Sequence, residues 1–183
     1  MNPWLWNELR ALFDTDDGSL PEVRVDYRDP AAPTLGYALL RGRAARVVND
    51  NAYFWSKTHD AERPLDSVSN AAALVVSGEA EAFHVVLGGI QSRSVAIPDL
   101  GVFVFTDQLA IDYRMGPAWG PKELEGFFGL LGELTSLDPD ATLSLEEGVL
   151  PDVVARFQSA WRRWSAEHAA EQLRAADGAS SRR

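Results

Sequence analysis

Short stretches that alternate apolar and charged residues mark the predicted strands of this chain. The clearest stretch covers residues 22–28, and residues 109–114 repeat its Asp-Tyr-Arg ending. Side chains on a strand point alternately to the two sides of its sheet, so the apolar half of each stretch should face the core. We therefore expect Tyr27 and Tyr113 to face the protein. Their charged neighbours should face outward or lie at a strand end: Asp26, Arg28, Asp112 and Arg114.

Four successive apolar stretches between residues 83 and 114 predict a run of neighbouring strands, at 83–87, 94–97, 102–105 and 109–114. The connections between them are short, and a parallel return needs a crossover of a dozen residues or more, so these strands should be antiparallel. Residues 34–40 and 44–48 are predicted to form a further hairpin. Residues 49–64 have no periodicity and predict a long loop or an irregular edge.

Helical periodicity appears at both ends of the chain and once in between. Residues 3–13 predict a short helix, Pro121 begins a second helix, and Pro151 begins a last helix that reaches about Ala175. Proline suits the first turn of a helix. Residues 67–77 fit either a short helix or a strand that pairs with 83–87.

The helix that begins at Pro121 has an apolar face and, opposite it, a face that carries glycines. Its apolar stripe repeats at helical spacing, and we expect Phe128 and Leu131 in it to be buried against the sheet. The opposite side carries Gly126, Gly129 and Gly132. Each glycine costs about 1 kcal/mol relative to alanine in a helix interior. The helix either tolerates this cost or lets the last helix, or another subunit, approach closely.

These elements predict an α+β fold: an antiparallel sheet of about five to seven strands, two C-terminal helices packed on one face, and a short N-terminal helix. A chain of 183 residues can bury a core as one domain. We expect that domain to cover residues 1–176 and residues 177–183 to form a disordered tail.

The composition of the chain argues against several kinds of partner and of active site. The net charge is −10, and residues 107–152 hold ten acids and two bases. Acidic charge repels phosphate backbones, so nucleic acid is not an expected partner. No stretch is long and apolar enough for a membrane span, and the first residues do not resemble a signal peptide, so we expect a cytoplasmic protein without membrane contact. The absence of cysteine excludes thiol nucleophiles and thiolate metal sites.

No catalytic, metal-binding or phosphate-binding motif is present. The three histidines, His59, His84 and His168, lack the spacing of a zinc site, and His84 fits a hydrogen-bonded structural residue of a strand. We therefore expect no metal and no cofactor. A small hydrolase or transferase remains an alternative, and its site would draw on Asp50, Lys57, His59, Asp112 and Arg114. A buried Asp112 close to His59 or His84 would remove most of the support for a non-enzymatic interaction protein.

The best candidate for a binding surface is the stretch from Asn49 to Asp60, in which Tyr53, Phe54 and Trp55 are consecutive aromatics. Aromatic residues supply large contact areas at low entropic cost. The structural alternative is that Tyr53 and Trp55 cap the sheet while Phe54 fills the core. A third hypothesis is a small-molecule site. The candidate binding residues are Asp50, Tyr53, Trp55, Lys57, His59, Asp112, Arg114 and Trp119.

In size, acidity and lack of catalytic residues, the chain resembles small bacterial proteins that neutralise or chaperone a partner, such as toxin-immunity proteins. The resemblance is one of type and covers no diagnostic motif. It implies a non-enzymatic, acidic protein-interaction module that binds a basic protein partner. The length of the last helix also suggests a homodimer that packs this helix against its mate.

Overall fold

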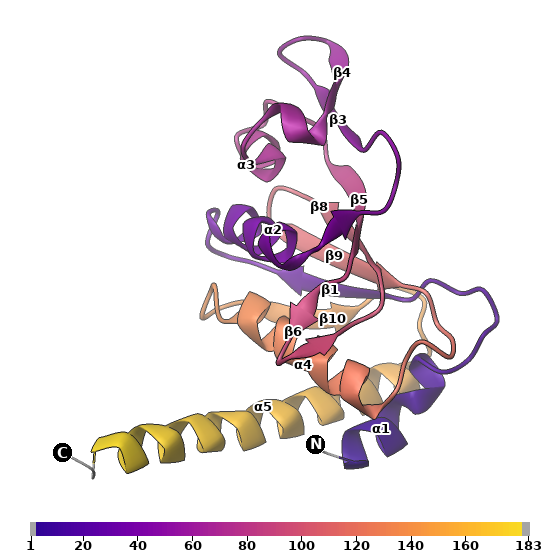
Figure 1. The fold of residues 1–183 in the computed structure, drawn as a ribbon, viewed down its shortest axis with the longest axis vertical. Coiled ribbons are helices and arrows are strands. Elements are labelled where there is room, and N and C mark those ends of the chain that lie inside the picture. The colour runs from indigo at the N-terminus through magenta and orange to yellow at the C-terminus, as the bar shows by residue number, and fades with distance from the viewer. Residues whose placement is uncertain (1–2, 181–183) are drawn as a thin grey trace.

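An antiparallel sheet of six strands organises the computed structural model, which describes the backbone of residues 3–180 and the side chains of residues 3–170 (Figure 1). The strand order across the sheet is β10-β1-β9-β8-β5-β2. The strands are β10 (Thr142–Leu145), β1 (Glu22–Asp26), β9 (Gln108–Tyr113), β8 (Leu100–Val104), β5 (Phe83–Gly88) and β2 (Arg46–Val47). Two separate hairpins are β3 (Tyr53–Ser56) with β4 (Ala61–Pro64), and β6 (Gln91–Ser92) with β7 (Val95–Ala96).

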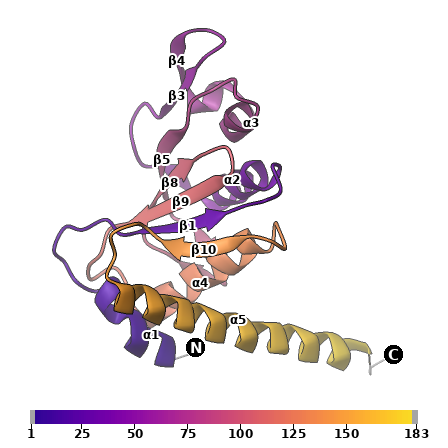
Figure 2. The ribbon, with the colours of Figure 1, turned by 180° about the vertical axis from the view of Figure 1, so that it is seen from behind.

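The helices gather on one side of the sheet, and the view from behind has the strands in front of α2 and α4 (Figure 2). They are α1 (Pro3–Leu9), α2 (Ala32–Arg43), α3 (Ala71–Val76), α4 (Pro121–Thr135) and α5 (Pro151–Ser180), with short 3-10 turns η1 (Arg10–Leu12) and η2 (Leu65–Ser67). This arrangement confirms the predicted α+β class, the antiparallel sheet, the N-terminal helix and the two C-terminal helices. None of the helices within the described residues is long and apolar enough to cross a membrane.

The alternation of residues in the strands separates the two faces of the sheet. Paired residues share a face, and every second residue of β1, β9, β8 and β5 is apolar and buried beneath the helices. One buried row across these strands is formed by Val23, Ile111, Val102 and Val85. Tyr27 and Tyr113 are buried, as predicted. Burial raises the pKa of the Tyr113 hydroxyl above its usual range.

Helix α4 is enclosed between the sheet and α5. Phe127 packs edge-on against Phe13 and Tyr113, on the side of the sheet and α1. Phe128 and Leu131 are fully buried, as predicted, and the ring of Phe128 contacts Phe157 of α5 and its neighbouring tryptophans. The apolar stripe of α4 therefore faces α5 as well as the sheet.

The three glycines of α4 permit close approach, and the segments that cover them belong to the same chain. An added Cβ would lie 3.0 Å from a methyl of Ile97 at Gly126, 2.7 Å from the Arg93 side chain at Gly129, and 3.1 Å from the Trp164 ring at Gly132. The β6–β7 hairpin and α5 therefore occupy the side opposite the sheet. Close approach, and not tolerance, explains these glycines.

The predicted hairpin over residues 34–48 is wrong, because residues 32–43 form helix α2. Its buried residues follow helical spacing, with Pro33 in the first turn and Gly36, Tyr37 and Leu40 facing inward. Of the predicted second strand, only β2 remains. The predicted loop over 49–64 contains the β3–β4 hairpin, and the segment before Pro151, for which no strand was predicted, contains β10. The helical alternative for 67–77 is confirmed in the shorter span of α3.

Helix α5 begins at Pro151, as predicted, and extends through Ser180. Its buried residues Phe157, Ala160 and Trp164 pack on the rest of the domain. Residues 177–180 of the predicted tail fall within the span of α5, and residues 181–183 lie outside the described residues. The predicted disorder of that tail and the predicted homodimer stay predictions.

Candidate functional site

The sheet has one face that no helix covers, and we call it the open face (Figure 2). The strand register defines it, because residues paired across neighbouring strands point to the same side. Its residues are Glu22, Arg24 and Asp26 of β1, Gln108, Ala110 and Asp112 of β9, Gly101 and Phe103 of β8, and His84 and Val86 of β5. Antiparallel sheets commonly leave one face to solvent. This face is unusual in carrying aromatic rings and paired charges.

The exposed aromatic side chains of the described residues all lie on this side of the molecule. They are Tyr53, 50% exposed, Trp55, 37% exposed, and Phe105, 36% exposed. Phe105 follows β8 and stacks on Phe103 of the open face, with ring centroids 6.2 Å apart. Large apolar side chains usually leave solvent on folding, so exposed rings gathered on one side indicate a binding surface.

The β3–β4 hairpin presents two of these rings. Its residues alternate, so that Phe54 and Ser56 are buried while Tyr53 and Trp55 are exposed. Phe54 fills the core, as the structural alternative for this segment has it, whereas Tyr53 and Trp55 remain open to solvent.

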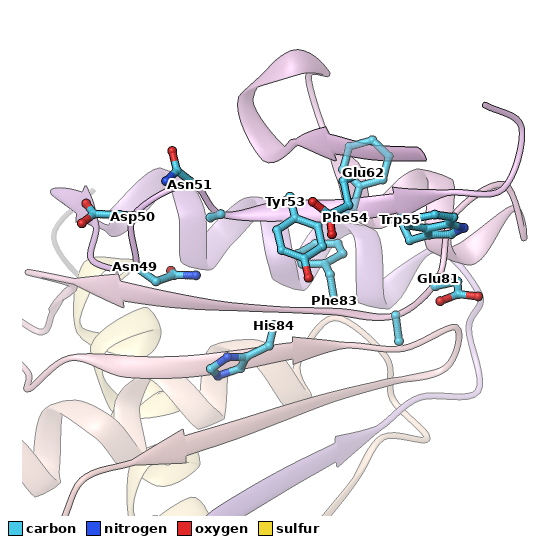
Figure 3. Close-up of a pocket in the computed structure, with 12 residues that line it drawn as sticks. Asn49, Asp50, Asn51, Tyr53, Phe54, Trp55, Glu62, Glu81, Phe83 and His84 are labelled. Carbon is cyan, nitrogen blue, oxygen red and sulfur yellow. The ribbon is translucent and has the colours of Figure 1, made fainter. Parts of the chain in front are cut away.

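A depression of ≈400 Å³ lies between this hairpin and the start of β5 (Figure 3). Its lining runs along residues 49–55 and 81–84, with Glu62 added from β4. Three carboxylates, those of Asp50, Glu62 and Glu81, are among the lining residues, and no lysine or arginine is. A second depression shares Glu81 and Ala82 with the first and continues to Phe105. The two hollows therefore form one surface along the exposed rings.

A histidine and an aspartate are paired on the open face. Nε2 of His84 lies 2.9 Å from Oδ2 of Asp112, across the intervening strand β8. A carboxylate only accepts hydrogen bonds, so Nε2 carries the proton. The ring of Phe103 packs against the imidazole, with centroids 4.1 Å apart. On β1, Nε of Arg24 donates a hydrogen bond to the carboxylate of Glu22, and this bond raises the pKa of the Arg24 guanidinium.

The pair depends on Gly101, which lies on β8 between the two side chains. A Cβ at Gly101 would be 2.1 Å from Oδ2 of Asp112, so any side chain there would displace the carboxylate. We expect Gly101→Ala to break the His84–Asp112 hydrogen bond and to lower the free energy of unfolding by about 1–3 kcal/mol. Chemical denaturation measures the loss, and the imidazole ¹⁵N shifts report the bond.

A double-mutant cycle separates this effect from a general disturbance of β8. Asp112→Ala removes the atoms that the new methyl group would meet, so adding Gly101→Ala to Asp112→Ala should cost clearly less than adding it to the wild type. Equal costs in the two backgrounds would show that the carboxylate does not require the glycine.

The structure brings together some of the predicted site residues and separates others. Asp50, Tyr53 and Trp55 line the first depression, and Lys57 borders the second. Asp112 lies on the open face, paired with His84. His59 lies in the turn of the hairpin, where its Nδ1 is 3.0 Å from the Ser56 hydroxyl.

Arg114 and Trp119 do not belong to this surface. Trp119 is buried, packs edge-on against Phe13 and Phe127, and donates from its indole nitrogen to the carbonyl of Arg114. Its prediction as a binding residue is corrected by this burial. The exposed Arg114 side chain follows β9 at the end away from the β3–β4 hairpin.

Sequence reasoning missed His84, Glu62, Glu81 and Phe105 as members of this surface. His84 was assigned a structural role, and its position on the outward side of β5 was the available signal. Glu62 lies opposite Trp55 only because β3 pairs with β4, and that pairing was not predicted. Glu81 is brought to Trp55 by a hydrogen bond from its N–H to the carbonyl of Trp55.

The arrangement limits the chemistry that the surface can perform. The lining of the first depression contains no serine or threonine, so its only hydroxyl is the phenol of Tyr53. Figure 3 shows the imidazole of His84 directed away from Trp55 and Glu81. No group of three His, Asp or Glu side chains among the described residues is placed to hold a metal ion.

Comparisons with known proteins gave no relationship that would assign a function. No protein-family model matches the chain, and neither the curated proteins nor the solved structures gave a match.

Proposed function

We propose that this protein is a non-enzymatic interaction module that binds a basic protein partner through its open face and the β3–β4 hairpin. The observation that carries the proposal is the placement of the exposed aromatic rings. Tyr53, Trp55 and Phe105 all lie on the side that no helix covers. Aromatic residues are enriched in protein interfaces, where their rings provide contact area at little entropic cost.

The charge of the same side supports a basic partner. Asp50, Glu62 and Glu81 line the first depression, and Asp26 and Asp107 line the second together with Lys57. Carboxylates around apolar rings attract a positively charged partner and favour its association over that of acidic proteins. An inhibitor or immunity protein is one class of module that would use such a surface.

A small enzyme is the second candidate, and the His84–Asp112 pair favours it. Asp112 is close to His84, which meets one condition of the enzymatic hypothesis, but it is half-buried, with 16% of its side chain exposed, so the second condition, a buried Asp112, is not met. An aspartate that orients an imidazole can support general-base catalysis. Against this, the first depression is lined by no serine or threonine among the described residues, the second adds Thr106 alone, and the imidazole points away from Trp55 and Glu81.

Differential capture from native lysate tests the interaction hypothesis. Immobilised wild-type protein is compared with the double variant Trp55→Glu/Phe105→Glu, which places two negative charges on the exposed rings. We expect a stoichiometric partner that is retained by the wild type, lost from the variant, and weakened at higher salt because exposed charges are screened within about 10 Å at 0.1 M ionic strength.

The matched control is Leu35→Glu/Leu150→Glu, which adds the same charge at exposed leucines of α2 and of the segment before α5. This control should retain the partner. A partner lost equally from both variants, or kept by both, would argue against the open face as the binding surface.

A further inference from the structure

The carboxylates beside Tyr53 and Trp55 have no cation of their own. The ion pairs within the described residues include none for Asp50, Glu62 or Glu81. Two basic side chains lie near these carboxylates: the imidazole of His84 is already paired with Asp112, and Lys57, which lines the second depression with Glu81, forms no ion pair among the described residues. The depression therefore offers negative charge that is not neutralised from within the chain.

The two aromatic rings are placed beside these carboxylates. Trp55 and Glu62 are directly opposite each other in the β3–β4 register, so their side chains share a face of the hairpin. Figure 3 shows Glu81 beside Trp55, and the ring of Tyr53 extending from β3 toward β5. A guanidinium stacks on aromatic rings and forms paired hydrogen bonds with carboxylates, and it is more weakly hydrated than an ammonium. Arginine fits this combination better than lysine.

The outer edge of β5 is also interrupted at the depression. β2 pairs only with Leu87 and Gly88, and the N–H of Val86 donates to the side chain of Asn49. On the other side of this interruption, the N–H of Glu81 donates a backbone hydrogen bond to the carbonyl of Trp55. His84 therefore lies where β5 has no neighbouring strand on this side among the described residues. An unpaired stretch of strand can bind an extended polypeptide through its backbone.

From these three features we propose that the depression between the β3–β4 hairpin and β5 docks an extended, arginine-bearing segment of the partner. Arginine side chains stack on Tyr53 and Trp55 and pair with Asp50, Glu62 and Glu81, while the backbone of the segment lies along β5 at His84. This inference rests on the proposed interaction function and names the chemistry of the partner at that surface.

Fluorescence anisotropy on the full chain tests the proposal with a labelled peptide of alternating arginine and valine. We expect Tyr53→Ala/Trp55→Ala and Glu62→Gln/Glu81→Gln each to weaken binding by at least about tenfold, since each removes two contacts to guanidinium groups. All four side chains are exposed, so the variants should fold, and thermal melting checks this.

The matched control is Glu8→Gln/Asp140→Asn, which removes the same charge from exposed acids of α1 and of the loop before β10. It should change the affinity by less than about twofold, because isolated surface charges contribute little. A peptide with citrulline in place of arginine should not bind. A lysine version should bind more weakly than the arginine version.

The proposal fails if the control variant weakens binding as much as Glu62→Gln/Glu81→Gln, or if the aromatic variant binds like the wild type. It also fails if the lysine peptide binds as tightly as the arginine peptide. Should the arginine peptide not bind while a lysate partner is still lost from Trp55→Glu/Phe105→Glu, only the arginine chemistry is wrong and the interaction function stands. Absence of both results would overturn both proposals.

Discussion

Phe128→Ala should lower the free energy of unfolding by about 3–5 kcal/mol, because it removes a fully buried ring and leaves a cavity. The ring contacts Phe157, Trp161 and Trp164 of α5, with centroids 5.8–5.9 Å away. Most of the loss should therefore come from the α4–α5 interface. Urea denaturation followed by tryptophan fluorescence measures the change.

Phe105→Ala is the matched control, since it removes the same side chain from an exposed position. Its effect should stay within about 0.5 kcal/mol. If Phe128→Ala costs no more than this control, α5 does not pack on α4 as the structure has it.

Gly36→Leu should be the most damaging substitution in α2. A Cβ at Gly36 would already lie 2.6 Å from a methyl of Leu109, 3.2 Å from the Tyr27 hydroxyl and 3.3 Å from a methyl of Leu134. The rest of a leucine side chain has no room there, so we expect a loss of about 3 kcal/mol or more, or a chain that does not fold. Thermal and chemical denaturation distinguish these outcomes.

Gly42→Leu provides the comparison within the same helix. No atom lies within 4 Å of a Cβ at Gly42, and leucine is a better helix former than glycine. The variant should be neutral or slightly more stable than the wild type. If both glycines tolerate leucine equally, α2 does not lie against β9.

The sequence predicted the elements whose local pattern agrees with their tertiary surroundings. In β1 polar and buried apolar residues alternate strictly, and in β9 the buried Ala110 interrupts the alternation, because one face of the sheet is buried and the other is open. The prolines at 121 and 151 begin helices at their first turns. Helix α2 was missed because Gly42, between the two predicted strands, is typical of a hairpin turn, whereas it lies within the helix. The apolar residues of this stretch are few, so their spacing fits both a helix and a strand.

The candidate surface was predicted only where consecutive residues carry it. Tyr53 and Trp55 are neighbours in a short aromatic run, whereas Glu81 and Phe105 join them through tertiary pairing that no local pattern encodes. The charge of a residue also did not show whether that residue lies on the surface. Asp138 belongs to the acidic block, yet it is buried and accepts hydrogen bonds from the N–H groups of Arg28, Asp29 and Asp140. The bonds from Asp29 and Asp140 are the main cause that lowers its pKa.

The strand order has a consequence for how the chain acquires its structure during synthesis. β5, β8 and β9 are separated in sequence only by the short β6–β7 hairpin and a turn, so they can pair soon after they leave the ribosome. β1, in contrast, pairs with β9 and β10, which are made much later. Contacts between residues far apart in sequence close slowly. The nascent chain therefore carries β1 without a partner until β9 emerges, and β1 remains an edge strand until β10 follows. A translational pause before β10 has emerged would leave that edge open to other chains, whereas a pause after β10 has paired with β1 would not.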